Sequence, residues 1–187
     1  MRLFVAIDLD AEARGSVGAE QQRLARVLDA RGSLRWVKPE QMHLTLSFLG
    51  EVDEARGAAV ADAMRAPIPV APFTMRFRGL GVFPPRGAPS VLWLGVADGS
   101  AQAIDLQRRV ADRLEPLGGP REARPYHPHL TLARWRDGRP GAARRALAAD
   151  GGREIARVDV RYVTLYQSRL SPHGPTYTAL AQAELST

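Results

Sequence analysis

Residues 43–46 of this chain read His-Leu-Thr-Leu, and residues 129–132 repeat the same four letters. Each copy is rich in strand-forming residues and follows a stretch whose apolar residues have helical spacing, so the local context recurs as well. No tandem repeat with the period of a solenoid protein accompanies them. Two such copies in a chain of 187 residues predict a duplicated α+β unit, in which each of two lobes contributes one strand to a central cleft.

The segments around the two copies alternate between strand-like and helix-like patterns, separated by Gly- and Pro-rich turns. We therefore expect an α+β fold that is bilobal and pseudo-symmetric, with two antiparallel sheets forming the cleft and the helices outside, in a single domain over residues 1–187. The expected strands span 4–9, 34–37, 44–49, 73–80, 91–96, 129–135, 154–160, 162–169 and 176–183. The expected helices span 11–31, 54–66, 100–114 and 141–148. The apolar stripes of the two long helices are Val17, Leu24, Val27 and Leu28, and Ile104, Leu106, Val110 and Leu114.

Strand geometry sorts each motif onto two faces, because side chains two positions apart point the same way. The predicted polar face carries His43, Thr45 and Ser47 in one strand and His129, Thr131 and Ala133 in the other. The predicted core face carries Leu44, Leu46 and Phe48, and Leu130 and Leu132. Arg134 also falls opposite His129, unless the strand contains a bulge.

The paired histidines and threonines have the chemistry that a phosphate diester requires. Histidine has a reference pKa near 6.5, so one ring can be neutral while another is protonated at the same pH. The neutral ring can accept a proton from attacking water, and the imidazolium can protonate the departing oxygen. Thr45 and Thr131 can donate hydrogen bonds to the non-bridging oxygens. The pattern predicts acid–base catalysis without a metal or another cofactor.

Composition narrows the possible functions further. The net charge of +6 and the pI near 10.6 favour a polyanionic partner, although the excess of arginine over lysine is equally compatible with a bias in base composition. Lys38 is the single lysine and stands in neither a nucleotidyl-transfer motif nor a phosphate-binding loop. The chain has no cysteine, no apolar run of membrane-spanning length and no signal-peptide pattern, so we expect a soluble protein, consistent with the cytoplasm. We also expect it to be a monomer.

The segment 35–50, Arg-Trp-Val-Lys-Pro-Glu-Gln-Met-His-Leu-Thr-Leu-Ser-Phe-Leu-Gly, resembles the first signature of the 2H phosphoesterases, and 128–134, Pro-His-Leu-Thr-Leu-Ala-Arg, resembles the second. The similarity is to their RNA 2′,3′-cyclic phosphodiesterase branch, also called 2′-5′ RNA ligase, and extends over nearly the whole chain. It implies hydrolysis of an RNA 2′,3′-cyclic phosphate end to a 2′-phosphate, and it allows for reversible, ATP-independent 2′-5′ joining. It also implies that His43 is the proton donor and His129 the proton acceptor, and that Phe48 and Arg134 contact the substrate.

Three other interpretations stay open from the sequence. A 2H relative could act on a small cyclic nucleotide, such as an ADP-ribose cyclic phosphate, with the same residues. A noncatalytic RNA-binding module could keep the fold, although the intact His and Thr of both motifs oppose this. A metal site could use His127 and His129 with His43, although no carboxylate lies close to them in sequence.

Overall fold

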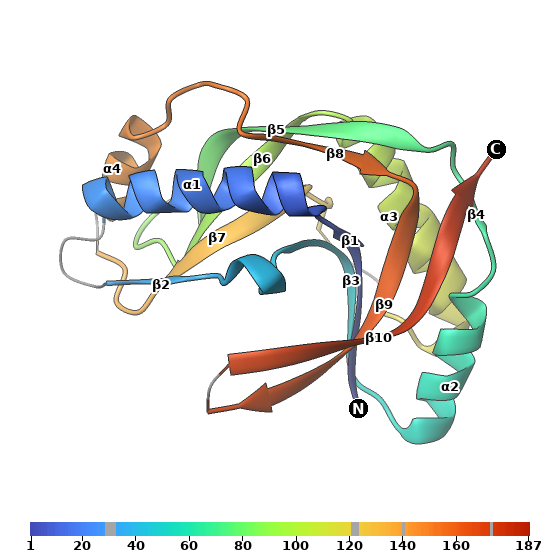
Figure 1. Cartoon of the computed structure of the whole chain (residues 1–187). Helices are drawn as coiled ribbons and strands as arrows, with labels where there is room; N and C mark the ends of the chain where they lie inside the picture. The colour runs from blue at the N-terminus through green and yellow to red at the C-terminus, as the bar shows by residue number, and fades with distance from the viewer. Residues whose placement is uncertain (29–32, 121–123, 140, 173) are drawn as a thin grey trace.

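The computed structural model describes residues 1–28, 33–120, 124–139, 141–172 and 174–187. Two five-stranded sheets and four α-helices are formed in these residues (Figure 1). The first sheet contains β1 (Arg2–Asp8), β3 (His43–Glu51), β4 (Ile68–Pro69), β9 (Tyr162–Ser171) and β10 (Gly174–Ser186). The second contains β2 (Leu34–Trp36), β5 (Phe73–Phe83), β6 (Val91–Asp98), β7 (His129–Trp135) and β8 (Ala156–Val160). The α+β, two-lobed prediction is confirmed.

Each predicted motif lies on a strand of a different sheet. The strand order is β3-β1-β9-β10-β4 in the first sheet and β2-β7-β6-β5-β8 in the second. Neighbouring strands are antiparallel except for the short pair of β4 with β10, which is parallel. The sequence did not predict β4, because two residues are too few to show an alternating pattern. These strand orders place the two motif strands differently. In the described residues β3 is the edge strand of its sheet, whereas β7 has β2 on its outer side.

The two longest helices, α1 and α3, connect the two lobes because each packs on the opposite sheet (Figure 1). Helix α1 (Ala11–Leu28) follows β1 of the first sheet but packs against β8 of the second, next to α4 (Ala142–Ala148). Helix α3 (Ser100–Leu114) follows β6 of the second sheet but packs against β3 and β4 of the first, beside α2 (Glu54–Ala63). Short 3-10 turns at Pro39–Gln41 and Glu115–Leu117 complete the described helical structure. Within the described ranges, no helix combines the length and the apolar character needed to cross a membrane.

Two residues of the predicted apolar stripes are exposed, so their assignment was wrong. Val27 is 60% exposed and Ile104 is 44% exposed. A helix turns about 100° per residue, which places Val27 about 60° from Leu24 and about 80° from Val17, and Ile104 about 160° from Leu106. Positions 29–31 of the first predicted helix lie outside the described residues.

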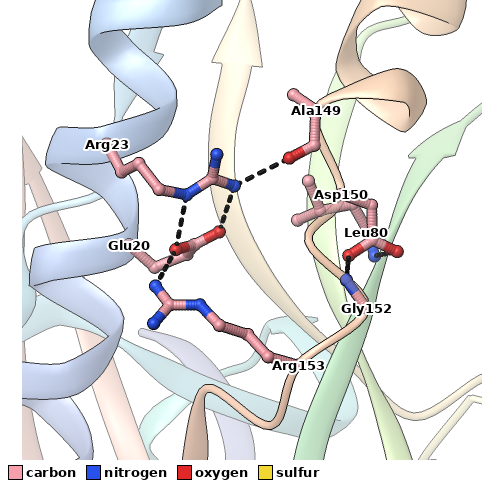
Figure 2. Close-up of polar contacts among 7 residues, drawn as sticks. All are labelled: Glu20, Arg23, Leu80, Ala149, Asp150, Gly152 and Arg153. Carbon is pink, nitrogen blue, oxygen red and sulfur yellow. Dashed lines mark hydrogen bonds and ion pairs between the residues drawn. The ribbon is translucent and has the colours of Figure 1, made fainter.

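A buried carboxylate fastens α1 to the second lobe (Figure 2). Glu20 accepts hydrogen bonds from Arg23, at 2.6 and 2.9 Å, and from Arg153, at 2.9 Å. Arg23 also donates to the carbonyl of Ala149, just after α4, at 2.7 Å. Burial alone would raise the pKa of Glu20, but the hydrogen bonds from the two arginines outweigh it and lower the pKa. These contacts fix the position of α1, whose neighbouring residue Gln21 reaches the motif strand β7.

Candidate active site

Strand β3 contains a bulge at Leu46, the fourth residue of its motif. In the ladder with β1, Ala6 pairs with Thr45 and Val5 pairs with Ser47, so Leu46 has no partner of its own. Leu46 and Ser47 are consequently both buried, and the alternation of faces is reset beyond them.

Strand β7 contains the same bulge at the equivalent position. Trp93 of β6 pairs with Thr131 and Leu92 pairs with Ala133, so Leu132 is the additional residue. Leu132 and Ala133 are both fully buried. The duplication therefore preserves a local irregularity of the backbone as well as the four motif residues.

The two bulges reverse the prediction that Phe48 and Arg134 point away from the histidines. Phe48 is 54% exposed, and its ring lies 5.8 Å from that of Phe4, which in turn stacks on His43. Arg134 is exposed, and its positive charge lowers the pKa of His129. Both residues thus lie on the histidine face. The prediction was wrong because period-two counting assumes a regular strand, and one inserted residue inverts every later position.

His43 lies in an aromatic pocket with one acidic neighbour. Its ring stacks on Phe4 at 4.7 Å and meets Tyr177 edge-on at 5.2 Å. Burial lowers the pKa of His43 to about 4, and a hydrogen bond with the Gln41 backbone and the negative charge of Asp8 act in the opposite direction. Asp8 is the direct partner of His43 in the β1–β3 ladder.

The carboxylate of Asp8 is held by two hydroxyl groups of β9. Tyr166 donates to one of its oxygens and Thr164 to the other, each at 2.7 Å. Thr164 is fully buried, and Tyr166 stacks on Phe4 at 5.3 Å. These bonds orient the charge beside the first histidine.

His129 has a cationic neighbour, Arg134, in place of the acidic one. Its Nδ1 lies 2.7 Å from the His127 carbonyl, which can only accept, so Nδ1 carries the hydrogen and the neutral ring has its free lone pair on Nε2. Burial lowers the pKa of His129, the bond to His127 opposes this, and the charges of His127 and Arg134 lower it further. The residue opposite His129 in the ladder is Gly95, which brings no charge.

The two histidine environments meet between the lobes. Strands β3 and β7 pack against each other, and the Tyr126 hydroxyl donates to the Thr45 carbonyl at 2.7 Å. Burial raises the pKa of Tyr177, and the positive charges of Arg134 and Arg2 oppose that rise. Because Tyr177 also touches His43, the guanidinium of the second lobe acts on the aromatic pocket of the first.

Comparison with known proteins assigns this chain to a family. A family model described as the 2′-5′ RNA ligase superfamily matches residues 12–171. The chain belongs to the 2′-5′ RNA ligase superfamily. It is 33% identical over 180 residues to the RNA 2′,3′-cyclic phosphodiesterase of Archaeoglobus fulgidus, covering 96% of this chain and 98% of the relative. It is 36% identical over 193 residues to the RNA 2′,3′-cyclic phosphodiesterase of Thermus thermophilus, covering 99% and 90%.

Solved structures of the superfamily share the fold throughout. The crystal structure of E. coli LigT complexed with 3′-AMP aligns with a TM-score of 0.76 at 29% identity, covering 100% of this chain and 98% of that one. TT0787 of Thermus thermophilus aligns with a TM-score of 0.76 at 31% identity, covering 98% and 97%. The bilobal 2H phosphoesterase fold predicted from the two motifs is thereby confirmed.

Gln21 supports the strand of the second motif. The sequence motifs did not single out this residue. Its buried side-chain amide donates to the carbonyls of Val37 and of the bulged Leu132, both at 2.9 Å. A signal for it exists, because Gln21 stands 22 residues before His43 and Gln107 stands 22 residues before His129. Gln107 is likewise buried, on α3, which packs against β3. Matching glutamines are thus a further trace of the duplication.

The described part of the structure gives no support for the histidine metal site that the sequence left open. Across the described ranges, no group of three or more His, Cys, Asp or Glu side chains is arranged to hold a metal ion. His127 is exposed and makes ring contacts with Phe83, Trp93 and His129.

Proposed function

We propose that this protein hydrolyses RNA 2′,3′-cyclic phosphate ends to 2′-phosphomonoesters by acid–base catalysis with His43 and His129, without a metal. The observation that carries the proposal is the matched pair of bulged His-x-Thr strands, one from each lobe, packed against each other. The names of the relatives, RNA 2′,3′-cyclic phosphodiesterase, support the same substrate class.

In the proposed reaction, water attacks the phosphorus atom while the bond from phosphorus to O3′ breaks. The Nε2 of neutral His129 accepts the proton of the attacking water, and protonated His43 donates a proton to the departing O3′. The product therefore keeps its phosphate on O2′. The proton gained by His129 and the one lost by His43 return through solvent.

The unequal charges around the two histidines support this division of roles. Asp8 lies opposite His43 and favours its protonated form, whereas Gly95 lies opposite His129. Arg134 and His127 disfavour a proton on His129, as a base requires. Burial lowers both pKa values in the free protein, so the bound phosphate anion has to raise the pKa of His43 for the donor to be charged.

The remaining predicted site residues take supporting roles in this proposal. Thr45 and Thr131 share the face of their histidines and donate hydrogen bonds to the non-bridging oxygens. Arg134 neutralises part of the phosphate charge. Phe48 offers an exposed ring for stacking on a base.

The decisive experiment incubates the protein with an oligoribonucleotide ending in a 2′,3′-cyclic phosphate and identifies the product by ³¹P NMR. We expect a 2′-phosphomonoester, at a rate unchanged by chelator. A 3′-phosphate product would contradict the assignment of the leaving oxygen, and no turnover would contradict the proposed function.

The same groups serve a second proposed reaction, 2′-5′ joining, in which a 5′-hydroxyl replaces water as the nucleophile and no ATP is used. We also propose that the chain acts as one domain of two lobes, as a monomer in the cytoplasm. Both sheets contribute side chains to one hydrophobic core, which supports the single domain. Light scattering after size-exclusion chromatography tests the monomer.

A further inference from the structure

Two arginines lie directly opposite each other on neighbouring strands of the second sheet. Arg35 of β2 pairs with Arg134 of β7, so both side chains leave the same face. The next residue across that row is Val91, and beyond it is Phe83, whose ring meets His129 at 5.0 Å. The row therefore belongs to the histidine face.

The arginine pair is unfavourable without an anion. Like charges directly opposite in a ladder repel, and both side chains are exposed. Among the residues that the structure describes, neither arginine takes part in an ion pair or a side-chain hydrogen bond, whereas Arg23, Arg76, Arg108 and Arg153 all pair with carboxylates. Two unpaired guanidinium groups side by side are suited to phosphate oxygens.

We propose that Arg35 binds the phosphodiester on the 5′ side of the terminal nucleotide, while Arg134 faces the cyclic phosphate. This inference rests on the proposed function and specifies its substrate as an RNA chain rather than a free cyclic nucleotide. Arg134 is the inner of the two, because its charge acts on His129 and on Tyr177. Arg35 lies one strand farther out, about 5 Å away at the backbone, with a long side chain to reach the next phosphate.

The first lobe has no equivalent of Arg35. Strand β3 ends its sheet within the described residues, and Phe48 occupies the position that matches Arg134. The row through Phe48 continues over Phe4 and Tyr166 and is aromatic, whereas the matching row of the second lobe begins with two cations, Arg35 and Arg134. If the RNA chain leaves the site over β7 and β2, its phosphates can pair with Arg134 and Arg35. The terminal base can then stack on Phe48.

The test compares two substrates that differ by one phosphodiester: cyclic 2′,3′-AMP and ApA ending in a 2′,3′-cyclic phosphate. We expect Arg35→Gln to raise the KM for the dinucleotide about tenfold and to change that for cyclic AMP by less than about twofold. Arg35→Lys should recover part of the loss, because it keeps the charge but not the planar fork. Arg108→Gln, which removes an arginine paired with Asp105 on α3, should leave both substrates unchanged.

A binding measurement separates this inference from the proposed function, because it needs no turnover. Fluorescence anisotropy with labelled ApApA ending in a 2′-phosphate should show about tenfold weaker binding for Arg35→Gln, and a slope of log Kd against log salt reduced by about 0.7. Weaker binding without turnover in the native protein would overturn the proposed function and keep the phosphate site. Equal binding by the two proteins, or equal loss on both substrates above, would overturn the phosphate site.

Discussion

Aromatic rings flank both histidines, but the charged neighbour of His43 is the carboxylate of Asp8, whereas that of His129 is the cationic Arg134. The two strands nevertheless share a bulge directly after the third motif residue. Duplication therefore explains the geometry, and divergence of the flanking residues explains the different electrostatics. The two motifs are identical in sequence, and charged groups outside them give the two histidines different electrostatic environments.

The largest expected effect is the loss of either motif histidine. His43→Ala and His129→Ala should each lower turnover of an RNA cyclic phosphate about 10²- to 10⁴-fold, because each removes one proton transfer. The thermal unfolding midpoint should show that both variants fold. His127→Gln is the comparison, since it keeps the carbonyl that orients His129, and it should lose much less. Near-normal turnover in either alanine variant would refute two-histidine catalysis.

Removing the support of the second bulge should affect β7 without touching β3. Gln21→Leu leaves the carbonyls of Leu132 and Val37 without their side-chain donor, so the free energy of unfolding should fall by about 1–3 kcal/mol. Gln22→Leu, at the neighbouring exposed position, is the matched control and should change it little. Denaturant titration measures both. An equal effect of the two substitutions would show that the bonds to β7 contribute nothing measurable.

The apolar side of the site can be tested through Phe48. Phe48→Ala should raise the KM for RNA several-fold, in line with about 1 kcal/mol for one stacked base, and should leave stability unchanged because the ring is 54% exposed. Val27→Ala removes a similarly exposed apolar side chain on α1 and should affect neither. A large loss of stability in Phe48→Ala would instead indicate a packing role.

The pH dependence reports both environments together. Because the pKa of His43 is lowered to about 4 and that of His129 is also lowered, the two histidines of the free protein take up their first proton below the reference pKa of histidine. The maximum of kcat/KM should therefore lie below about pH 6.5, the reference value for histidine. The profile of kcat should lie at higher pH, since the bound phosphate raises both pKa values. A kcat/KM maximum above neutrality would contradict the lowered values.

The smallest expected effect sharpens the difference between the two sides most directly. Asp8→Asn removes the negative charge that favours protonated His43, so the alkaline limb of the kcat profile should move to lower pH by about half a unit. Asp10→Asn is the control, because asparagine can still accept from the Ala13 amide at the start of α1. An unshifted limb in Asp8→Asn would remove the electrostatic basis for naming His43 the donor.

The sequence by itself determined the four α-helices, every strand except the short β4, the duplication, and the polar and apolar sides of each motif up to its fourth residue. These follow from local periodicity, and Leu44, Leu46, Leu130 and Leu132 are buried as predicted. It also contained the matching spacing of Gln21 and Gln107, which was recognisable only once one of them was seen to bind a motif strand.

Only the tertiary structure decided what lies beyond the fourth motif residue and which charges face each histidine. A bulge depends on how one strand pairs with its neighbour. Counting alternate positions along β3 or β7 alone therefore cannot show that Phe48 and Arg134 lie on the histidine face. Asp8 and Arg35 are distant in sequence from the residues that they face, and strand pairing alone brings them into register with His43 and Arg134. The proposed catalytic histidines are recognisable from local sequence, whereas the different charges around them depend on how the strands pair.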